Sequence, residues 1–282
     1  MIGTIWNTII YEPILNVLLL FYGLLGDNLG WAIIVLTIVL RAVLFPLMKS
    51  QYESSAKLRS LQPQLEKLKK KYKRNPKKAQ EEQMKMFKKA GYNPLGCLLS
   101  TLLPFPILIA IYQTIRLFSS GEAISGVYGF VGNFLDMNGN ITINPYFLGV
   151  DLSLGYTELT PEYGYVGLIV LPYLGLALLT GLSQYLSVQF NQKMMGVAKP
   201  ESDEKKNESS SKTKKKETPS TPDMTSMMTD MTKSMKYTFP LMSVFIAVSL
   251  PAAVSLYWIL QSWIPVAMYQ IYNKLNAHTN GK

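Results

Sequence analysis

The chain has 282 residues, of which 48% are hydrophobic and only 16% are charged, and its formal net charge is +10. Soluble chains average about 25% charged residues, so this composition excludes an ordinary soluble enzyme. The basic residues are also segregated, because 14 of the 28 lie within residues 49–89 and 10 within residues 193–236. The long apolar stretches between these blocks exclude a purely disordered basic protein and predict an all-α protein with several membrane spans.

The first predicted element is residues 1–27, an amphipathic helix lying in the outer membrane interface. Residues 5–25 are apolar enough for a span, but Asn7, Glu12, Pro13 and Asn16 interrupt them and no basic residue flanks them. A secretory signal peptide would need a basic start and a small-residue cleavage site, and neither is evident. We expect Glu12 and Asn16 to face water. A sixth span is the alternative.

Five later stretches are long and apolar enough to cross a bilayer, for which about 20 residues suffice. They are residues 28–48, 94–118, 164–190, 231–250 and 251–275. The last two are contiguous, so Leu250 and Pro251 must form a tight turn, with the proline starting the next helix. The expected fold is therefore a five-transmembrane-helix bundle with a cytoplasmic helical hairpin and an N-terminal interfacial helix.

The charges of the loops predict the direction of the spans. Residues 49–93 carry 14 basic and 4 acidic side chains, whereas residues 119–163 carry five acids and no Lys or Arg. Basic loops stay in the cytoplasm, so the acidic loop lies outside the cell. The N-terminus is then outside, and the tail at residues 276–282 is cytoplasmic.

Residues 49–93 are predicted to form a basic helical hairpin. Their apolar side chains follow the alternating steps of three and four of a coiled-coil seam: Leu58, Leu61, Leu65, Leu68 and Tyr72. The turn lies at Asn75 and Pro76, and the return arm places Met84 and Phe87 on one face. Such an arm suits anionic lipid headgroups, a targeting factor or ribosomal RNA, and the sequence does not choose among these partners.

The second cytoplasmic loop, at residues 191–230, has a different composition. Its Ser, Thr, Lys, Glu and Pro content and its lack of aromatic residues in residues 199–223 predict a disordered loop.

Arg41 is the most informative residue, because it lies within a predicted span. It precedes Lys49 by eight positions, which places it ~12 Å inside the cytoplasmic end of the helix. A charge near the bilayer centre costs roughly 2.5–3.5 kcal/mol, so it should face the bundle interior or a wet cavity. No acid lies at membrane depth in the five spans. Either backbone carbonyls near a proline break satisfy Arg41, or it is the positive charge of a water-filled pocket for an acidic or polar ligand.

Other polar residues in the spans are candidates for the same pocket. Thr37 lies one helical turn before Arg41 on the same face. Gln184 and Gln261 lie on other spans, where each either joins the pocket or forms a hydrogen bond between helices.

The sequence lacks the usual residues of catalytic and cofactor sites. The chain has one cysteine, Cys97, and one histidine, His278, and it contains no phosphate-binding loop, dinucleotide fingerprint or zinc-protease motif. We therefore expect neither an enzyme nor a metal or cofactor site.

These residues resemble the YidC/Oxa/Alb family of membrane protein insertases over nearly the whole chain. The strongest part is residues 30–65, which begin Gly-Trp-Ala-Ile-Ile-Val-Leu-Thr-Ile-Val-Leu-Arg-Ala-Val-Leu-Phe-Pro-Leu. Further matches are Tyr-Asn-Pro-Leu-Gly-Cys at residues 92–97 and Leu-Tyr-Trp-Ile-Leu-Gln-Ser at residues 256–262. The chain departs from the family at Ser100 and Pro104, where members often have Pro and Gln.

The resemblance implies a hydrophilic groove among the five spans, open to cytoplasm and lipid and closed outside. Arg41 matches the groove arginine, and Thr37 matches another groove position. Trp258, with Tyr257 beside it, falls where the family has a groove-side aromatic on the last span, and Gln184 and Gln261 are further groove candidates. The chain resembles bacterial members without the large periplasmic domain.

The function that the resemblance implies is insertion and chaperoning of membrane proteins in the bacterial inner membrane. Its expected partners are membrane-protein substrates and the lipid bilayer, with the ribosome, the signal recognition particle pathway and the Sec translocon as further candidates; no specific DNA binding is expected. The alternative is a small secondary transporter or channel that binds an anionic solute at Arg41. That alternative favours an internal repeat, which the sequence does not show, and it gives the basic hairpin no evident use.

Overall fold

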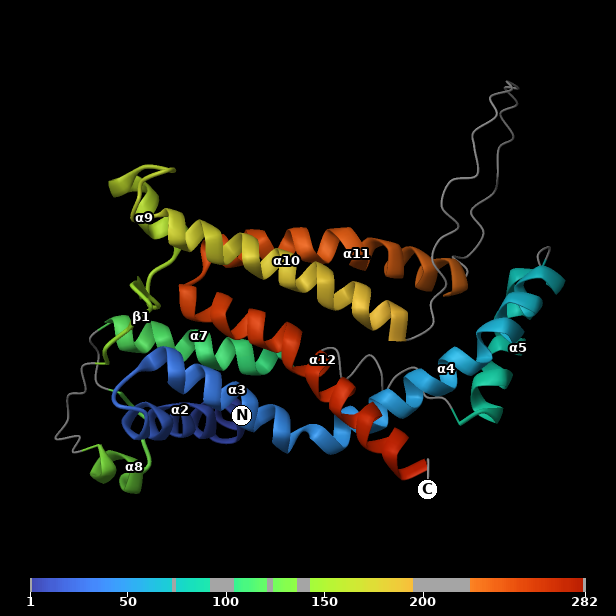
Figure 1. Ribbon diagram of the computed structural model, residues 1–282, viewed down its shortest axis with the longest axis horizontal. Helices are drawn as coiled ribbons and strands as arrows, with labels where there is room; N and C mark the ends of the chain where they lie inside the picture. Colours follow the sequence, from blue (N-terminus) through green and yellow to red (C-terminus); the bar gives the residue numbers. More distant parts are fainter. Residues whose placement is uncertain are drawn as a thin grey trace.

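The computed structural model describes residues 2–72, 75–91, 104–120, 124–135, 143–194 and 224–280. This part of the chain is mostly helical, with long helices side by side (Figure 1). Two short helices and a β-hairpin lie at one end, which we call the loop end; two helices project from the opposite end, which we call the arm end. The predicted span start at residues 94–103 and the predicted disordered stretch at residues 199–223 lie outside the described residues.

The N-terminal region is helical from α1 (Ile2–Trp6) through a π-helical turn, η1 (Asn7–Tyr11), to α2 (Glu12–Leu24). Its side chains enter the core, where Leu15, Leu18 and Leu19 are fully buried. The C-terminal end of α2 lies towards the loop end, where the chain turns back into the next helix (Figure 1).

Asn16 does not face water, so that expectation is wrong. Its side chain is 2% exposed. Its Nδ2 donates to the carbonyls of Glu12 and Gly126, both at 2.8 Å, and its Oδ1 accepts from the Tyr128 N–H at 2.6 Å. The amide is buried because it satisfies backbone groups of residues 126–128, which carry no regular hydrogen-bond ladder of their own.

The predicted span at residues 28–48 consists of parts of two helices, α3 (Leu29–Val43) and α4 (Phe45–Lys71), whose axes differ by 60°. Asn28 caps α3 by accepting a hydrogen bond from the Trp31 N–H at 3.1 Å. Pro46 lies in the first turn of α4, where its missing N–H is tolerated, and it cannot continue the hydrogen bonding of α3. The last residues of the predicted span therefore start the projecting pair of helices.

The arm is formed by α4 and α5 (Pro76–Lys89). Leu58, Leu61 and Leu65 pack against Phe87. Met86, rather than the expected Met84, packs beside Phe87. The Asn75 side chain caps α5 by accepting a hydrogen bond from the Lys78 N–H at 3.2 Å.

Four further long helices follow in the described part of the chain: α7 (Pro104–Ser120), α10 (Leu171–Met194), α11 (Met224–Ser249) and α12 (Ala252–Asn280). The helices α3, α10 and α12 run from the loop end towards the arm end, and α7 and α11 run in the opposite direction (Figure 1). Helix α12 contacts α3, α7 and α10, while α11 packs on α10. This arrangement makes α12 the shared neighbour of the other helices.

Helix α10 begins at Leu171, seven residues after the predicted start of the third span at residue 164. The stretch from residue 164 to residue 170 forms turns instead. Gly164 has a positive φ of 74°, which ends the preceding helix α9 (Tyr156–Tyr163) and points the chain away from a helical path. Pro172 then lies in the first turn of α10, where proline is favoured.

The loop end holds α8 (Gly129–Phe134), the antiparallel strands β1 (Tyr146–Phe147) and β2 (Val150–Asp151), and α9 (Tyr156–Tyr163). This end closes over the turn between α11 and α12. The first amides of α12 have no partner within the helix, and the Ala252 and Ala253 N–H groups donate to the carbonyls of Leu154 and Leu152, both at 2.9 Å.

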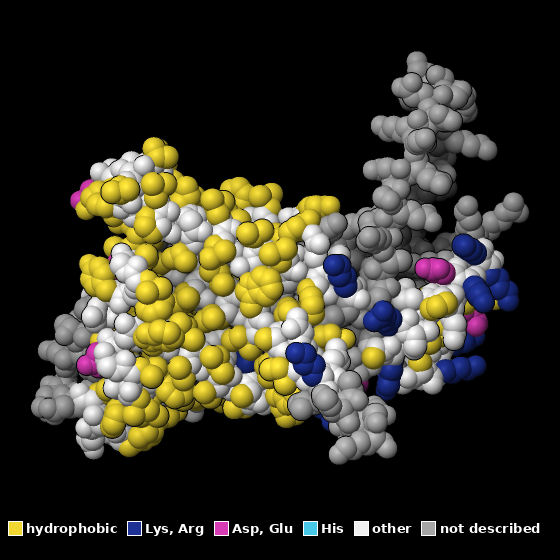
Figure 2. Space-filling model, viewed as in Figure 1, with side chains coloured by type: hydrophobic (Ala, Val, Ile, Leu, Met, Phe, Trp, Pro, Cys, Tyr) yellow, Lys and Arg dark blue, Asp and Glu magenta, His cyan; other side chains and the backbone are white. Residues whose placement is uncertain are grey.

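The surface shows where a membrane would fit. Apolar side chains cover the middle of the molecule, and Lys and Arg side chains gather at the arm end (Figure 2). Within the described ranges, Gly3–Leu24 and Leu171–Lys193 are long and apolar enough to cross a membrane, and the bent pair Leu29–Val43 and Phe45–Leu68 makes a third if it is one span. The five spans and the interfacial position of the N-terminal helix remain predictions.

Candidate functional site

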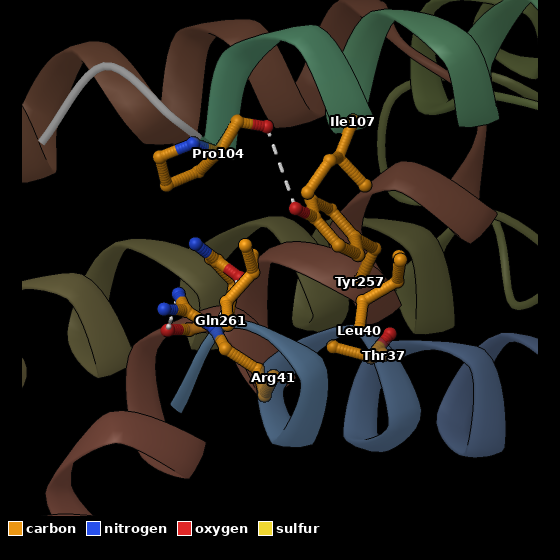
Figure 3. Close-up of a pocket in the computed structure, with 8 residues that line it drawn as sticks. Thr37, Leu40, Arg41, Pro104, Ile107, Tyr257 and Gln261 are labelled. Carbon is orange, nitrogen blue, oxygen red and sulfur yellow. Dashed lines mark hydrogen bonds between the residues drawn. The ribbon is translucent and has the colours of Figure 1, made fainter. Parts of the chain in front are cut away.

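Four of the predicted site residues meet in one pocket between α3, α7 and α12 (Figure 3). The pocket contains about 250 Å³ of empty space, including its opening. Its lining residues are Thr37, Leu40, Arg41, Leu44, Pro104, Ile107, Tyr257 and Gln261. One cationic side chain therefore lies among mostly apolar neighbours.

Arg41 lies in the last turn of α3 and points towards α12 (Figure 3). Its Nε donates to Gln261 Oε1 at 3.1 Å, and its Nη2 donates to the Gln261 backbone carbonyl at 3.3 Å. Its Nη1 lies 3.7 Å from Met48 Sδ, a weak acceptor. These contacts use three of the five N–H donors of a guanidinium and leave two for a ligand.

The Gln261 carbonyl is available to Arg41 because of a proline. In a regular helix it would accept the N–H of the residue four positions later, but that residue is Pro265, which has none. The sequence had suggested that backbone carbonyls near a proline break could satisfy Arg41, and Pro265 is such a break. The backbone does help to satisfy the arginine, although every acceptor that it finds is neutral.

No carboxylate neutralises Arg41 in the described part of the chain. The ion pair found there joins Lys85 and Glu82 at 2.8 Å, on the surface of the arm. Its hydrogen bond lowers the pKa of Glu82 and raises the pKa of Lys85, but it is solvent-exposed and adds little stability. The positive charge at Arg41 thus acts in an apolar surrounding, where it attracts an anion more strongly than it would in water.

Thr37 and Tyr257 form the inner part of the pocket, and each is 1% exposed. The Thr37 Oγ1 donates to the Ile33 carbonyl at 2.6 Å, so its lone pairs are available as acceptors. The Tyr257 hydroxyl donates to the Pro104 carbonyl at 3.4 Å and links α12 to the start of α7 (Figure 3). The pocket therefore offers one cation and two hydroxyl groups.

The structure does not bring Gln184 and Trp258 into this pocket. Trp258 Nε1 and Ser262 Oγ both donate to Gln184 Oε1, at 3.2 and 3.0 Å. Successive helix residues differ by about 100°, so Trp258 and Ser262 face α10 while the residues just before each face α3 and α7. These side chains join α10 to α12.

Met48 and Tyr52, on the first turns of α4, border the site and were not predicted to belong to it. The Tyr52 hydroxyl donates to the Pro265 carbonyl at 2.8 Å, and its ring lies 5.0 Å from that of Tyr269. Pro265 is a sequence signal only for the Arg41 contact, because a proline inside a span predicts a free carbonyl four residues earlier, at Gln261. No sequence signal pointed to the contact of Tyr52.

The chain matches a protein family over most of its length and individual relatives over parts of it. The family profile described as 60Kd inner membrane protein matches residues 20–279. A membrane protein insertase YidC of Thermotoga maritima is 33% identical over 187 residues, which are 62% of this chain and 41% of that protein. Proteins of the same name from Caulobacter vibrioides and Aromatoleum aromaticum are 43% and 41% identical over 104 and 107 residues. Those matches cover 37% and 38% of this chain and 17% and 19% of the relatives, so the chain spans well under half the length of these proteins.

Proposed function

The chain belongs to the YidC/Oxa/Alb family, whose profile carries the description 60Kd inner membrane protein, and from this membership we propose that it is a membrane protein insertase and chaperone of the bacterial inner membrane. The observation that carries the proposal is Arg41, a cation in a mostly apolar pocket, whose hydrogen-bond acceptors among the described residues are all neutral. Such a pocket is suited to binding a polar or acidic segment for a short time.

A substrate's polar segment enters the pocket from the arm end, which we place in the cytoplasm. A carboxylate of that segment accepts two parallel hydrogen bonds from the Arg41 guanidinium, and such charge-assisted pairs are about twice as strong as neutral ones. Thr37 and Tyr257 provide further polar contacts deeper in the pocket. The cost of moving the segment through the membrane falls because its charge is compensated on the way.

The apolar part of the substrate leaves sideways into lipid along α10 and α12. Both helices present apolar side chains to their surroundings, with Leu178, Leu182 and Trp263 between 41% and 55% exposed. Transfer of about 20 apolar residues into lipid supplies the driving force, at about 25 cal/mol per Å². No bond is made or broken, and the protein acts by holding and releasing the substrate.

The test uses purified protein in liposomes and a single-span substrate whose translocated tail carries either acids or neutral polar residues. Arg41→Ala should abolish insertion of the acidic tail and affect the neutral tail less, because only the acidic tail gains from the cation. Arg41→Lys should keep much of the activity, since it keeps the charge while losing the planar fork of donors. The control is Arg116→Ala, which removes an exposed arginine bonded to Tyr112 in α7 and should change nothing.

Two results would contradict the proposal. Insertion of the acidic tail by Arg41→Ala at the original rate would refute the electrostatic role. Arg41-dependent uptake of a small anion by the same liposomes, without substrate insertion, would support the transporter instead.

A further inference from the structure

Gln261 offers Arg41 two acceptors at once, one from its side chain and one from its backbone. The side-chain oxygen lies 3.1 Å from Nε, and the backbone oxygen lies 3.3 Å from Nη2. A single residue therefore holds the guanidinium with two roughly parallel contacts. A carboxylate would bind Arg41 in the same two-point manner.

Pro265 and Tyr52 hold this part of α12 in place. Pro265 leaves the Gln261 carbonyl without its helical donor, so that the carbonyl remains available to Arg41. The Tyr52 hydroxyl donates to the Pro265 carbonyl. Tyr52 lies about one helical turn after Met48 on α4. Helices α3 and α4 thus contact α12 at residues 261 and 265, one helical turn apart.

The two oxygens of Gln261 stabilise the Arg41 guanidinium when no ligand is bound. Their hydrogen bonds are neutral, so a charged ligand can replace them. Without them, the buried N–H donors would lack partners, which costs more than one ordinary hydrogen bond contributes. A neutral polar group of a ligand binds with little gain in free energy, because Arg41 then only exchanges one neutral acceptor for another. A carboxylate gains more, because its hydrogen bonds are charge-assisted.

We propose that Gln261 is an internal ligand of Arg41, which occupies the guanidinium until the polar segment of a substrate displaces it. This inference rests on the proposed function of the pocket as a substrate site. Its consequence is that a substrate carboxylate that pairs with both Nε and Nη2 binds less tightly than the pocket itself would allow, because it forms this pair only in the fraction of molecules with Gln261 displaced. Gln261 is then a competitor of the substrate and not one of its contacts.

The first experiment measures binding of a short, fluorescently labelled peptide with two aspartates to the purified full chain in nanodiscs. Gln261→Leu should tighten binding about threefold to tenfold, the size expected for loss of one competing neutral hydrogen bond. The same variant should melt at a lower temperature without peptide, because its Arg41 has lost a partner. A residue with a purely structural role would lower both the stability and the affinity.

Gln261→Glu should act in the opposite direction. Its carboxylate would pair with Arg41, so binding of the acidic peptide should weaken at least tenfold. The matched control is Gln113→Leu, which removes a glutamine bonded to Trp6 at 3.0 Å, far from the pocket, and should leave the affinity unchanged.

Pro265→Ala tests the backbone half of the contact. It restores the N–H that the Gln261 carbonyl lacks in the helix, so the carbonyl is drawn away from Arg41 and the peptide should again bind more tightly. Pro240→Ala is the control, since Pro240 also lies inside a helix, α11, but borders no part of the pocket.

The outcomes separate the inference from the proposed function. If the wild type binds the peptide, Arg41→Ala abolishes that binding and Gln261→Leu binds no more tightly than the wild type, the internal-ligand role is overturned and the pocket remains a substrate site. If the peptide binds equally well to Arg41→Ala, the pocket is not the substrate site. If neither the wild type nor Gln261→Leu binds the peptide, both are overturned.

Discussion

The guanidinium of Arg41 contacts neutral atoms of two residues, Gln261 and Met48. The two explanations suggested by the sequence, satisfaction by a backbone carbonyl and a charge awaiting a ligand, are therefore compatible. A guanidinium has five N–H donors, and the protein uses three of them. These hydrogen bonds lower the free-energy cost of keeping the charge inside the protein. They do not neutralise it, because none of the described acceptors carries a negative charge.

Substitution of Gln184 tests whether the contact between α10 and α12 is independent of the Arg41 pocket. Gln184→Leu removes the acceptor for Trp258 Nε1 and Ser262 Oγ, so we expect a loss of about 1–3 kcal/mol in the free energy of unfolding. The preference for acidic over neutral tails should not change, because Gln184 does not line the Arg41 pocket. Denaturation and the liposome assay measure the two effects, and a lost preference would place Gln184 in the substrate site.

Asn16 provides a second prediction about a single side chain. Asn16→Ala leaves the Tyr128 N–H and the Gly126 carbonyl without their partner, and it should lower the free energy of unfolding by about 1–3 kcal/mol. Asn28→Ala removes an exposed helix cap and should cost less, about 1 kcal/mol. Thermal melting of the two variants in one detergent compares them, and equal losses would mean that Asn16 does not secure this loop.

Proline and glycine decide where several helices begin and end. Pro46 and Pro172 start α4 and α10, and Gly164 ends α9 with a positive φ of 74°. The stretch from residue 164 to residue 170 is therefore not helical although it is apolar, and Leu168 is 87% exposed. Irregular backbone does not face the hydrocarbon of a bilayer, so we place this stretch in the headgroup region.

The arm should be separable from the rest of the molecule. Removing residues 58–88 and closing the gap deletes the cluster of Leu58, Leu61, Leu65 and Phe87, and it keeps Met48 and Tyr52 beside the pocket. We expect a stable, membrane-inserted protein that captures substrate more slowly, because the basic arm no longer attracts it. Added salt should slow capture by the intact protein towards the rate of the deletion variant. Failure of the deletion variant to insert stably would refute this separation.

Charge divides the whole molecule along its long direction. The visible Lys and Arg side chains gather at the arm end, and apolar side chains cover the helices between the two ends (Figure 2). The C-terminal end of α12 also lies towards the arm end (Figure 1). From this distribution the positive-inside rule predicts that the arm and the C-terminus lie in the cytoplasm.

Single cysteines in a Cys97→Ser background test this orientation. Lys77→Cys on α5 should react with an impermeant thiol reagent only after the cells are permeabilised, and Glu162→Cys on α9 should react in intact cells. Gly3→Cys, at a position where a larger side chain meets no neighbour, reports on the N-terminal helix. Labelling of Gly3→Cys from outside supports the interfacial helix, and labelling only from inside makes residues 3–24 a span. A reversed pattern for Lys77→Cys and Glu162→Cys overturns the orientation.

Some features of this protein follow from the sequence alone because they depend on neighbouring residues. Among these are the helical character of most apolar stretches, the turn at Asn75 and Pro76 before α5, and the importance of one arginine in an apolar segment. The resemblance to a known family was also evident in the sequence. Local spacing and proline chemistry are sufficient for such inferences.

Other features were decided only when distant segments came together. Asn16 is buried because residues 126–128 need its amide, and Gln184 faces Trp258 because α10 packs on one side of α12. The acceptors of Arg41 lie 220 residues away along the chain. The sequence shows that a buried polar group needs a partner, but only the packing of the helices determines which partner is close enough to form the hydrogen bond.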